Sequence, residues 1–162
     1  MTSTAIGRKL PILFNYRDTL FGNGFAVEVH AVNGRAVCSD EPDGVWMYGV
    51  NPGGMAARGD DADEARKEFR KAFSEILEDL ANEAASFQEF KALVDQFFGD
   101  TNPGYETDWV DGVKAVRNDL LHADGMRKSS ADAPRYVSVE MKEKKEFRPK
   151  DNTAELLPLL AA

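Results

Sequence analysis

The sequence predicts an α+β protein, with a three- to five-stranded antiparallel sheet, a long helix packed on one face and two additional helices. Three observations support this class. Apolar and polar residues alternate over residues 25–40, an apolar stripe at helical spacing runs from residue 65 to 84, and a second alternating segment covers residues 135–141. Strands therefore group before and after the helices instead of alternating with them, which favours α+β over a parallel α/β sheet.

The first alternating segment predicts a β-hairpin. Asn33-Gly34 is expected to form its two-residue turn, because both residues tolerate the positive φ of a type I′ turn. This register gives the hairpin one apolar face, formed by Phe25, Val27, Val29, Ala31, Ala36 and Cys38. The other face is mixed, with Glu28, His30, Val32, Arg35 and Val37. Such a sheet is typically covered on its apolar side. Residues 10–16 predict an earlier strand or extended arm, with Pro11 near its start.

The middle of the chain predicts strand, turn, short strand and helix in succession. Residues 45–50 alternate as a strand, the Asn-Pro-Gly-Gly sequence of residues 51–54 turns the chain, and residues 55–58 suffice for a short strand. Asp60 or Asp61 is expected to cap the long helix, whose apolar stripe should pack on the hairpin.

Two further helices are expected to form an insertion over residues 86–122. Ser86 and Glu89 fit a capping box for the first of them. The second is expected to begin after Thr107 or Asp108. Residues 122–134 are rich in turn-forming residues and predict a loop, while residues 142–162 predict a flexible tail. The length of 162 residues suits a single domain.

The net charge of −8 is concentrated in the middle of the chain. Residues 40–111 hold 18 acidic and 6 basic residues. Two interpretations remain open: a well-solvated helical surface, or an acidic face that attracts a basic partner. No apolar run approaches a membrane span and no signal sequence is evident, so we expect a cytoplasmic protein without a membrane partner. The single cysteine, Cys38, excludes an internal disulfide.

Candidate catalytic and ligand-binding motifs are weak. Residues 51–61 contain glycines before a helix but lack the Lys-Ser/Thr ending of a P-loop, and Asp60 and Asp61 would repel an anion there. His30 and His122 lie far apart in the sequence. Asp60, Asp61 and Asp63 could hold a magnesium ion, although helix capping and solvation are commoner roles.

Nucleophilic and acid–base chemistry also finds little support. Cys38 is expected to point into the core beneath the helix, and no Gly-x-Ser-x-Gly elbow occurs. Asp40 and Glu41 lie in a sequence typical of a turn. We therefore predict no catalytic, cofactor-binding or metal-binding residues, no cofactor and no enzymatic activity.

Two kinds of macromolecular partner are suggested. The basic residues 142–150, with Phe147 available for stacking, could contact nucleic acid, so DNA binding stays open beside a simple solvated tail. The apolar stripe of the helix after Ser86 is expected to belong mainly to the core. Its six large apolar residues exceed the needs of one small sheet, however, so part of the stripe, or residues 156–160, could be buried against a second copy. We therefore expect a homo-oligomer, most simply a homodimer.

Residues 44–73 resemble the HicB-like antitoxin family. That family shows an aromatic strand, a Pro-Gly turn, a short strand, Gly-Asp, and a helix opening with Glu-Ala. The matching positions here are Tyr48, Pro52, Gly53, Gly59, Asp60, Glu64 and Ala65. The resemblance implies a partly RNase-H-like β-β-β-α-β fold without nuclease carboxylates. In that framework Gly59 allows the bend into the helix, and Ala65 lets the helix lie close to the sheet.

The resemblance also implies a function. Antitoxins of this family bind and block a small basic messenger-RNA-cleaving toxin of the HicA type, and many carry a C-terminal DNA-binding module. This chain departs from the family in Gly54, where many members have cysteine, and in the helical insertion. No DNA-binding module is apparent after Met141. The function expected is a non-catalytic binding protein of the antitoxin kind; the alternative is a stand-alone homo-oligomeric interaction domain without a toxin.

Overall fold

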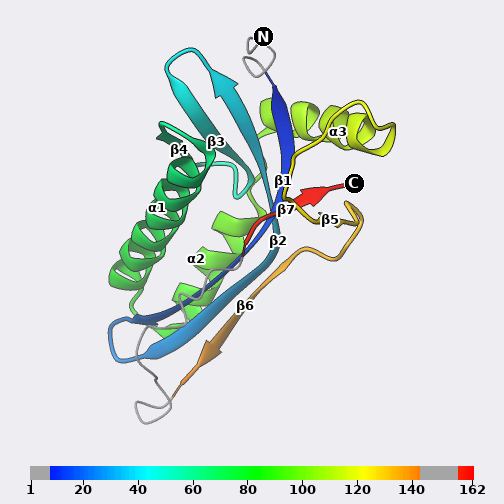
Figure 1. Cartoon of the computed structure of the whole chain (residues 1–162). Coiled ribbons are helices and arrows are strands. Elements are labelled where there is room, and N and C mark those ends of the chain that lie inside the picture. The colour runs from blue at the N-terminus through cyan, green and yellow to red at the C-terminus, as the bar shows by residue number, and fades with distance from the viewer. Residues whose placement is uncertain (1–7, 143–156) are drawn as a thin grey trace.

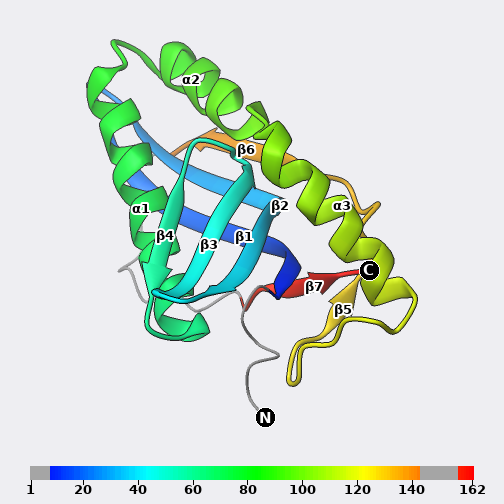
Figure 2. The same cartoon turned by 90° about the horizontal axis from the view of Figure 1, so that it is seen from above.

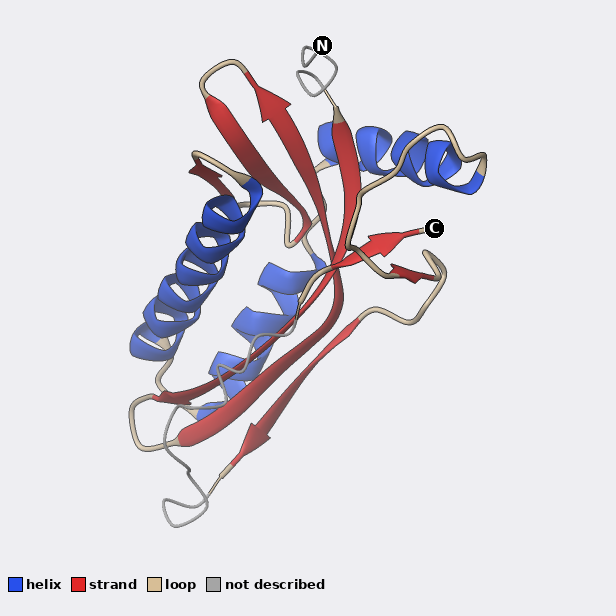
Figure 3. Ribbon diagram, in the orientation of Figure 1, coloured by secondary structure: helices blue, strands red, loops and turns tan. Residues whose placement is uncertain are grey.

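Two long antiparallel strands, β1 (Lys9–Phe21) and β2 (Ala26–Glu41), form the spine of the structure (Figures 1 and 3). The computed structural model describes residues 8–142 and 157–162. In this part of the chain, three helices accompany a seven-stranded, mostly antiparallel sheet of order β4-β3-β2-β1-β7-β5, with β6 also paired to β2. The remaining elements are β3 (Gly44–Asn51), β4 (Ala56–Gly59), α1 (Ala62–Glu83), α2 (Phe87–Gly99), α3 (Pro103–Arg117), β5 (Lys128–Ser129), β6 (Tyr136–Met141) and β7 (Leu159–Ala161). The predicted α+β class is confirmed, with more strands than expected.

The predicted hairpin turn at Asn33-Gly34 is wrong, because β2 continues through these residues. Val32 and Asn33 together oppose Asn15 of β1, which makes a β-bulge. Asn33 adopts the positive φ of 56° that the sequence suggested, and its N–H donates to Asn15 Oδ1 at 2.9 Å. The positive φ that Asn33 tolerates therefore serves a bulge within the strand, and the strand continues beyond it.

The bulge divides the second edge of β2 between two strands. β6 pairs with Val27–Val32 before the bulge, and β3 pairs with Arg35–Glu41 after it. Figure 3 shows the two partners at opposite ends of β2. Because the extra residue inverts the alternation of faces, the predicted apolar face survives: Val27 and Ala36 belong to the same core cluster, and Cys38 packs against it.

The helices α1 and α2 cover this apolar face. Phe69 and Phe73 of α1 lie edge-on to Phe14 of β1, with ring centroids 5.3 and 5.9 Å apart. The stripe of α2 packs here as well, since Phe90, Val94 and Phe98 are buried in the same cluster. The expectation that this stripe belongs mainly to the core is therefore confirmed.

The third helix, α3, lies on the opposite face from α1 and α2 (Figure 2). A second core cluster forms there from Leu13, Val37, Val50, Trp109, Val113 and Ala161. Gly112 brings α3 against Pro11, where a Cβ would approach the proline ring to 2.9 Å. Trp109 Nε1 donates to the carbonyl of Ile12 at 3.1 Å, which fixes the helix to β1.

Two boundaries differ from the prediction. The helix α3 begins at Pro103, not after Thr107 or Asp108, because Asn102 caps it by accepting from the N–H of Gly104. The tail predicted for residues 142–162 is wrong at its end, where β7 lies between β1 and β5 and Leu160 is buried opposite Ile12. Most of that tail, residues 143–156 with Phe147, lies outside the described residues.

The predicted loop over residues 122–134 contains the short strand β5. The other boundaries follow the sequence closely. Asp61 caps α1, and Ser86 caps α2 by accepting from the N–H of Glu89 at 3.2 Å. None of the helices in residues 8–142 and 157–162 is long and apolar enough to cross a membrane.

Candidate binding surface

Three aromatic rings stack on the sheet face that carries α3. Trp46 and Tyr48 of β3 lie parallel, with centroids 5.6 Å apart and an interplanar angle of 5°. Tyr105 of α3 stacks on Tyr48 at 4.3 Å and 10°. All three side chains are half-buried. We call these residues the aromatic ladder; β3 provides two of its rings because alternate strand residues share a face.

Carboxylates hold the polar atoms of two ladder residues. The hydroxyl of Tyr48 donates to Glu41 at 2.8 Å, and Trp46 Nε1 donates to Asp43 Oδ1 at 3.1 Å. Desolvation and the bond to Glu41 raise the pKa of Tyr48, so the phenol remains a neutral donor. These hydrogen bonds hold the rings of Trp46 and Tyr48 in one orientation within the chain.

The charges beside the ladder are predominantly acidic. Arg58 of β4, opposite Trp46 in the β3–β4 pair, forms ion pairs with Asp43 and Asp60 at 3.9 and 3.3 Å. Lys9 pairs with Asp108 of α3 at 3.2 Å. Together with Glu41, these residues provide four carboxylates and two cations, and both of these cations have acidic partners.

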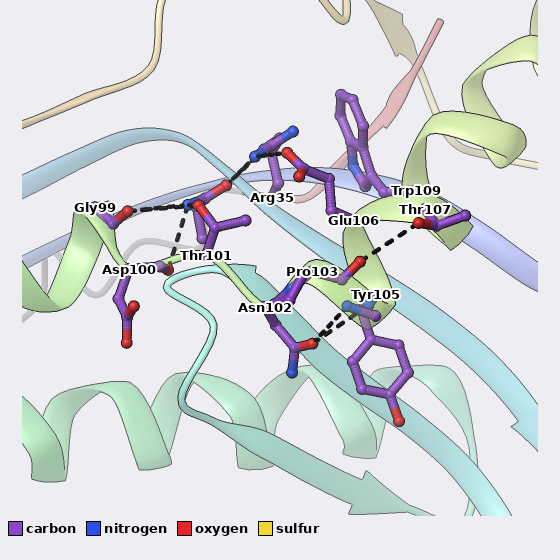
Figure 4. Close-up of polar contacts among 12 residues, drawn as sticks. Arg35, Gly99, Asp100, Thr101, Asn102, Pro103, Tyr105, Glu106, Thr107 and Trp109 are labelled. Atoms are coloured by element: carbon purple, nitrogen blue, oxygen red, sulfur yellow. Dashed lines mark hydrogen bonds and ion pairs between the residues drawn. The ribbon is translucent and has the colours of Figure 1, made fainter.

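A buried polar junction holds the start of α3 in place (Figure 4). Arg35, whose side chain is only 12% exposed, forms an ion pair with Glu106 at 2.9 Å and lies over the ring of Trp109. The same guanidinium donates to Asn51 Oδ1. A planar cation with several donors suits this position, because it can bind a carboxylate and an amide oxygen together.

Asn51 connects this junction to the segment between α2 and α3. Its Nδ2 donates to Thr101 Oγ1 at 2.7 Å and to the carbonyl of Asp100 at 3.3 Å. The N–H of Gly53 also donates to the Asp100 carbonyl at 2.9 Å, and the N–H of Asn102 donates to Val50. A Cβ at Gly53 would collide with Asn102. The Asn-Pro-Gly-Gly turn therefore anchors the segment between α2 and α3 and so places Tyr105 on Tyr48.

The opposite face holds a cavity of about 470 Å³ between β1, the first turn of α1 and residues 123–126. Its floor is apolar and includes Leu10 and Met47, whereas its rim mixes both signs of charge from Arg8, Arg66, Asp63 and Asp124. This mixture selects no single ligand chemistry. The aromatic ladder is the better-defined surface.

The acidic residues considered for magnesium have separate local roles. Asp61 accepts from the N–H of Glu64 at 2.8 Å as the helix cap, while Glu64 in turn accepts from the N–H of Asp60 at 2.7 Å. Asp60 also pairs with Arg58, and Asp63 is exposed. No group of three or more His, Cys, Asp or Glu side chains suited to a metal ion occurs among the residues that the structure describes.

The two histidines are not brought together. His30 is half-buried in β2, where desolvation and then Arg17 lower its pKa. His122 lies in the loop after α3, and its carbonyl accepts from Arg8.

Cys38 and the pair Asp40 and Glu41 belong to β2. Cys38 packs against the main core, and burial raises its pKa to about 11, so the thiol is a poor nucleophile at neutral pH. Asp40 forms an ion pair with Arg8 at 3.3 Å. The turn predicted at Asp40 and Glu41 starts later, since both residues are still paired to β3.

Sequence reasoning identified one member of the ladder by its position in the family motif, Tyr48, but assigned it no binding role. Tyr105 was missed, because its partner lies 57 positions earlier in the chain and is reached only through the fold. Scans against protein-family models, curated proteins and solved structures found no match to this chain.

Proposed function

We propose that this chain is a non-catalytic binding protein of the HicB-like antitoxin kind, and that its aromatic ladder binds a small basic toxin of the HicA type. One observation carries the proposal: Trp46, Tyr48 and Tyr105 form a half-buried stack on one face of the sheet, and carboxylates hold the polar atoms of Trp46 and Tyr48. Tryptophan and tyrosine are among the commonest anchors of protein–protein interfaces.

The electrostatics support a basic partner. The carboxylates of Glu41, Asp43, Asp60 and Asp108 lie beside the ladder, and the nearby cations Lys9 and Arg58 are already paired. A cationic protein would meet a complementary potential, which speeds association and disfavours acidic partners. The acidic composition of residues 40–111 also adds to the negative charge of the protein as a whole.

The alternative of a stand-alone homo-oligomeric domain is favoured by a different observation, the open edge of β6 argued below. The two functions use different surfaces, so they can be tested separately: binding of a basic toxin would exclude the stand-alone alternative, whereas dimerisation by itself would not exclude toxin binding.

The test is a titration of the full chain with the purified small basic protein encoded beside its gene, followed by calorimetry. We expect saturable binding that weakens as salt increases, because the acidic surface is screened. Trp46→Ala is expected to reduce the affinity by about tenfold to a hundredfold, as for an interface anchor. Phe21→Ala is the matched control, since Phe21 is 59% exposed on another strand and should leave affinity unchanged.

A functional measurement completes the test. The basic protein, expressed alone, should arrest the growth of the host cells. Co-expression of the parent chain or of Phe21→Ala should restore this growth, whereas co-expression of Trp46→Ala should not. Three results would overturn the proposal: no short basic reading frame beside the gene, no binding by the parent, or equal binding by parent and Trp46→Ala.

A further inference from the structure

Among the residues that the structure describes, the strand β6 presents an open backbone edge. The N–H of Lys142 donates to the carbonyl of Ala26 at 2.8 Å, which fixes the phase of the β2–β6 ladder. Because successive peptide groups alternate in direction, Val137, Val139 and Met141 point their N–H and C=O groups away from β2. Within residues 8–142 and 157–162, β2 is the only strand paired with β6.

We infer that a second copy of this chain pairs with this edge, β6 against β6, so that two sheets join into one. A twofold axis beside Val139 places Val139 opposite the second copy's Val139, and Val137 opposite the second copy's Met141. Each of these pairs can exchange both of its backbone hydrogen bonds. In this register every outward-pointing N–H and C=O group of Val137, Val139 and Met141 has a partner in the second copy.

The side chains are complementary in the same register. Ser138 lies opposite Glu140 and Tyr136 lies opposite Lys142, so no like charges oppose one another directly. Within each copy, Glu140 already has a cationic partner in Lys142 at 3.5 Å. Tyr136 and Met141, which are 52% and 56% exposed, would be covered by the second copy.

The two strands at the ends of the sheet order, β4 and β5, are less suited to pairing. The strand β4 has four residues, and Arg58 donates from this edge to the carbonyl of Asp43. The strand β5 has two residues. Short strands and charged side chains are the usual protection of a sheet edge. The strand β6, with six residues, is longer than either. Its buried residue, Val139, belongs to the core that α2 covers.

The experiment compares two substitutions at one position by sedimentation equilibrium of the full chain. Proline at residue 141 removes an outward N–H without removing a bond to β2, whereas alanine keeps that N–H. The parent and Met141→Ala are expected to be dimers. Met141→Pro is expected to dissociate at least tenfold more readily, with an unchanged far-ultraviolet circular dichroism spectrum. A monomeric parent, or equal dimerisation of both variants, would overturn the inference.

A cross-linking measurement keeps the test decisive if Met141→Pro does not fold. In a Cys38→Ala background, the pair Ser138→Cys and Glu140→Cys places each cysteine opposite the other residue of the second copy. Mild oxidation is expected to yield a covalent dimer that reducing agent reverses. A control pair, Thr19→Cys with Glu28→Cys, lies within one chain across β1 and β2 and should yield no dimer. Failure of the Ser138 and Glu140 pair to cross-link would also overturn the inference, whereas Trp46→Ala should leave cross-linking intact.

Discussion

Asn15 accepts a hydrogen bond from the N–H of Asn33 at 2.9 Å, and this contact closes the bulge at which β2 exchanges one neighbouring strand for another. Before the bulge β2 pairs with β6, and after it β2 pairs with β3. The side chain of Asn33 also donates to the carbonyl of Pro134 at 2.7 Å, just before β6 begins. Two asparagines on neighbouring strands thus determine where the sheet divides.

Substitution of Gly34 is expected to destabilise this bulge. A Cβ at residue 34 would collide with the ring of Phe14, which cannot move freely because Phe69 and Phe73 pack against it. We expect Gly34→Ala to lower the free energy of unfolding by about 1–3 kcal/mol, the usual cost of overpacking. Denaturant unfolding measures it. Gly54→Ala is the control, since the position is open and should show no loss. Equal stability of the two variants would contradict the collision.

Asn51 is expected to stabilise the junction between the sheet and the helices α2 and α3. It is fully buried, and its amide binds Arg35, Thr101 and the Asp100 carbonyl. Asn51→Ala should lower the free energy of unfolding by about 3 kcal/mol, because several buried polar groups lose their partner. Hydrogen exchange at the amides of Gly53 and Asn102 should accelerate in parallel.

The control for this prediction is Thr101→Val, which removes a single partner of Asn51. Its expected cost is about 1 kcal/mol, the value of one ordinary hydrogen bond. A cost for Asn51→Ala no greater than that of Thr101→Val would show that the junction is not cooperative.

Asp61 is expected to act as a helix cap. Its carboxylate accepts from the N–H of Glu64 at 2.8 Å, so Asp61→Ala should lower the free energy of unfolding by about 1 kcal/mol. Asp61→Ser retains a capping oxygen and should remain close to the parent. Thermal unfolding with and without magnesium separates the two proposed roles of the acidic cluster. A magnesium-dependent increase in Tm that Asp61→Ser loses would contradict a purely capping role.

Cys38 is expected to react slowly with thiol reagents in the folded chain. Burial, followed by the charge of Asp40, raises its pKa from 9.0 to about 11. The folded state therefore holds its proton more tightly than the unfolded state. This contribution to stability is fully present below pH 9, and it is lost as the pH rises from 9 to about 11. Thiol labelling followed against pH, in native buffer and in denaturant, gives the pKa of Cys38 in the folded and in the unfolded state. Rapid labelling of the folded chain at pH 7 would contradict the raised pKa.

The sequence by itself determined the features that depend on neighbours along the chain. The stripe of α1 and the caps at Asp61 and Ser86 were readable because they act within one or two helical turns. The strand–turn–strand order from β3 to β4 was readable for the same reason. The predicted apolar face of β2 was also correct. A turn and a bulge at Asn33-Gly34 both invert the alternation of side chains between the two faces, so both place the same residues on the apolar face.

Tertiary structure decided the features that depend on distant partners. Positive φ at Asn33 suits a turn or a bulge, and Asn15, 18 positions earlier, selects the bulge. The side of the sheet taken by α3 depends on Trp109 reaching Ile12, 97 positions away. The aromatic ladder likewise required Tyr105 to meet Tyr48. Such contacts leave no periodic signal, because their energy comes from residues that only the folded backbone brings together.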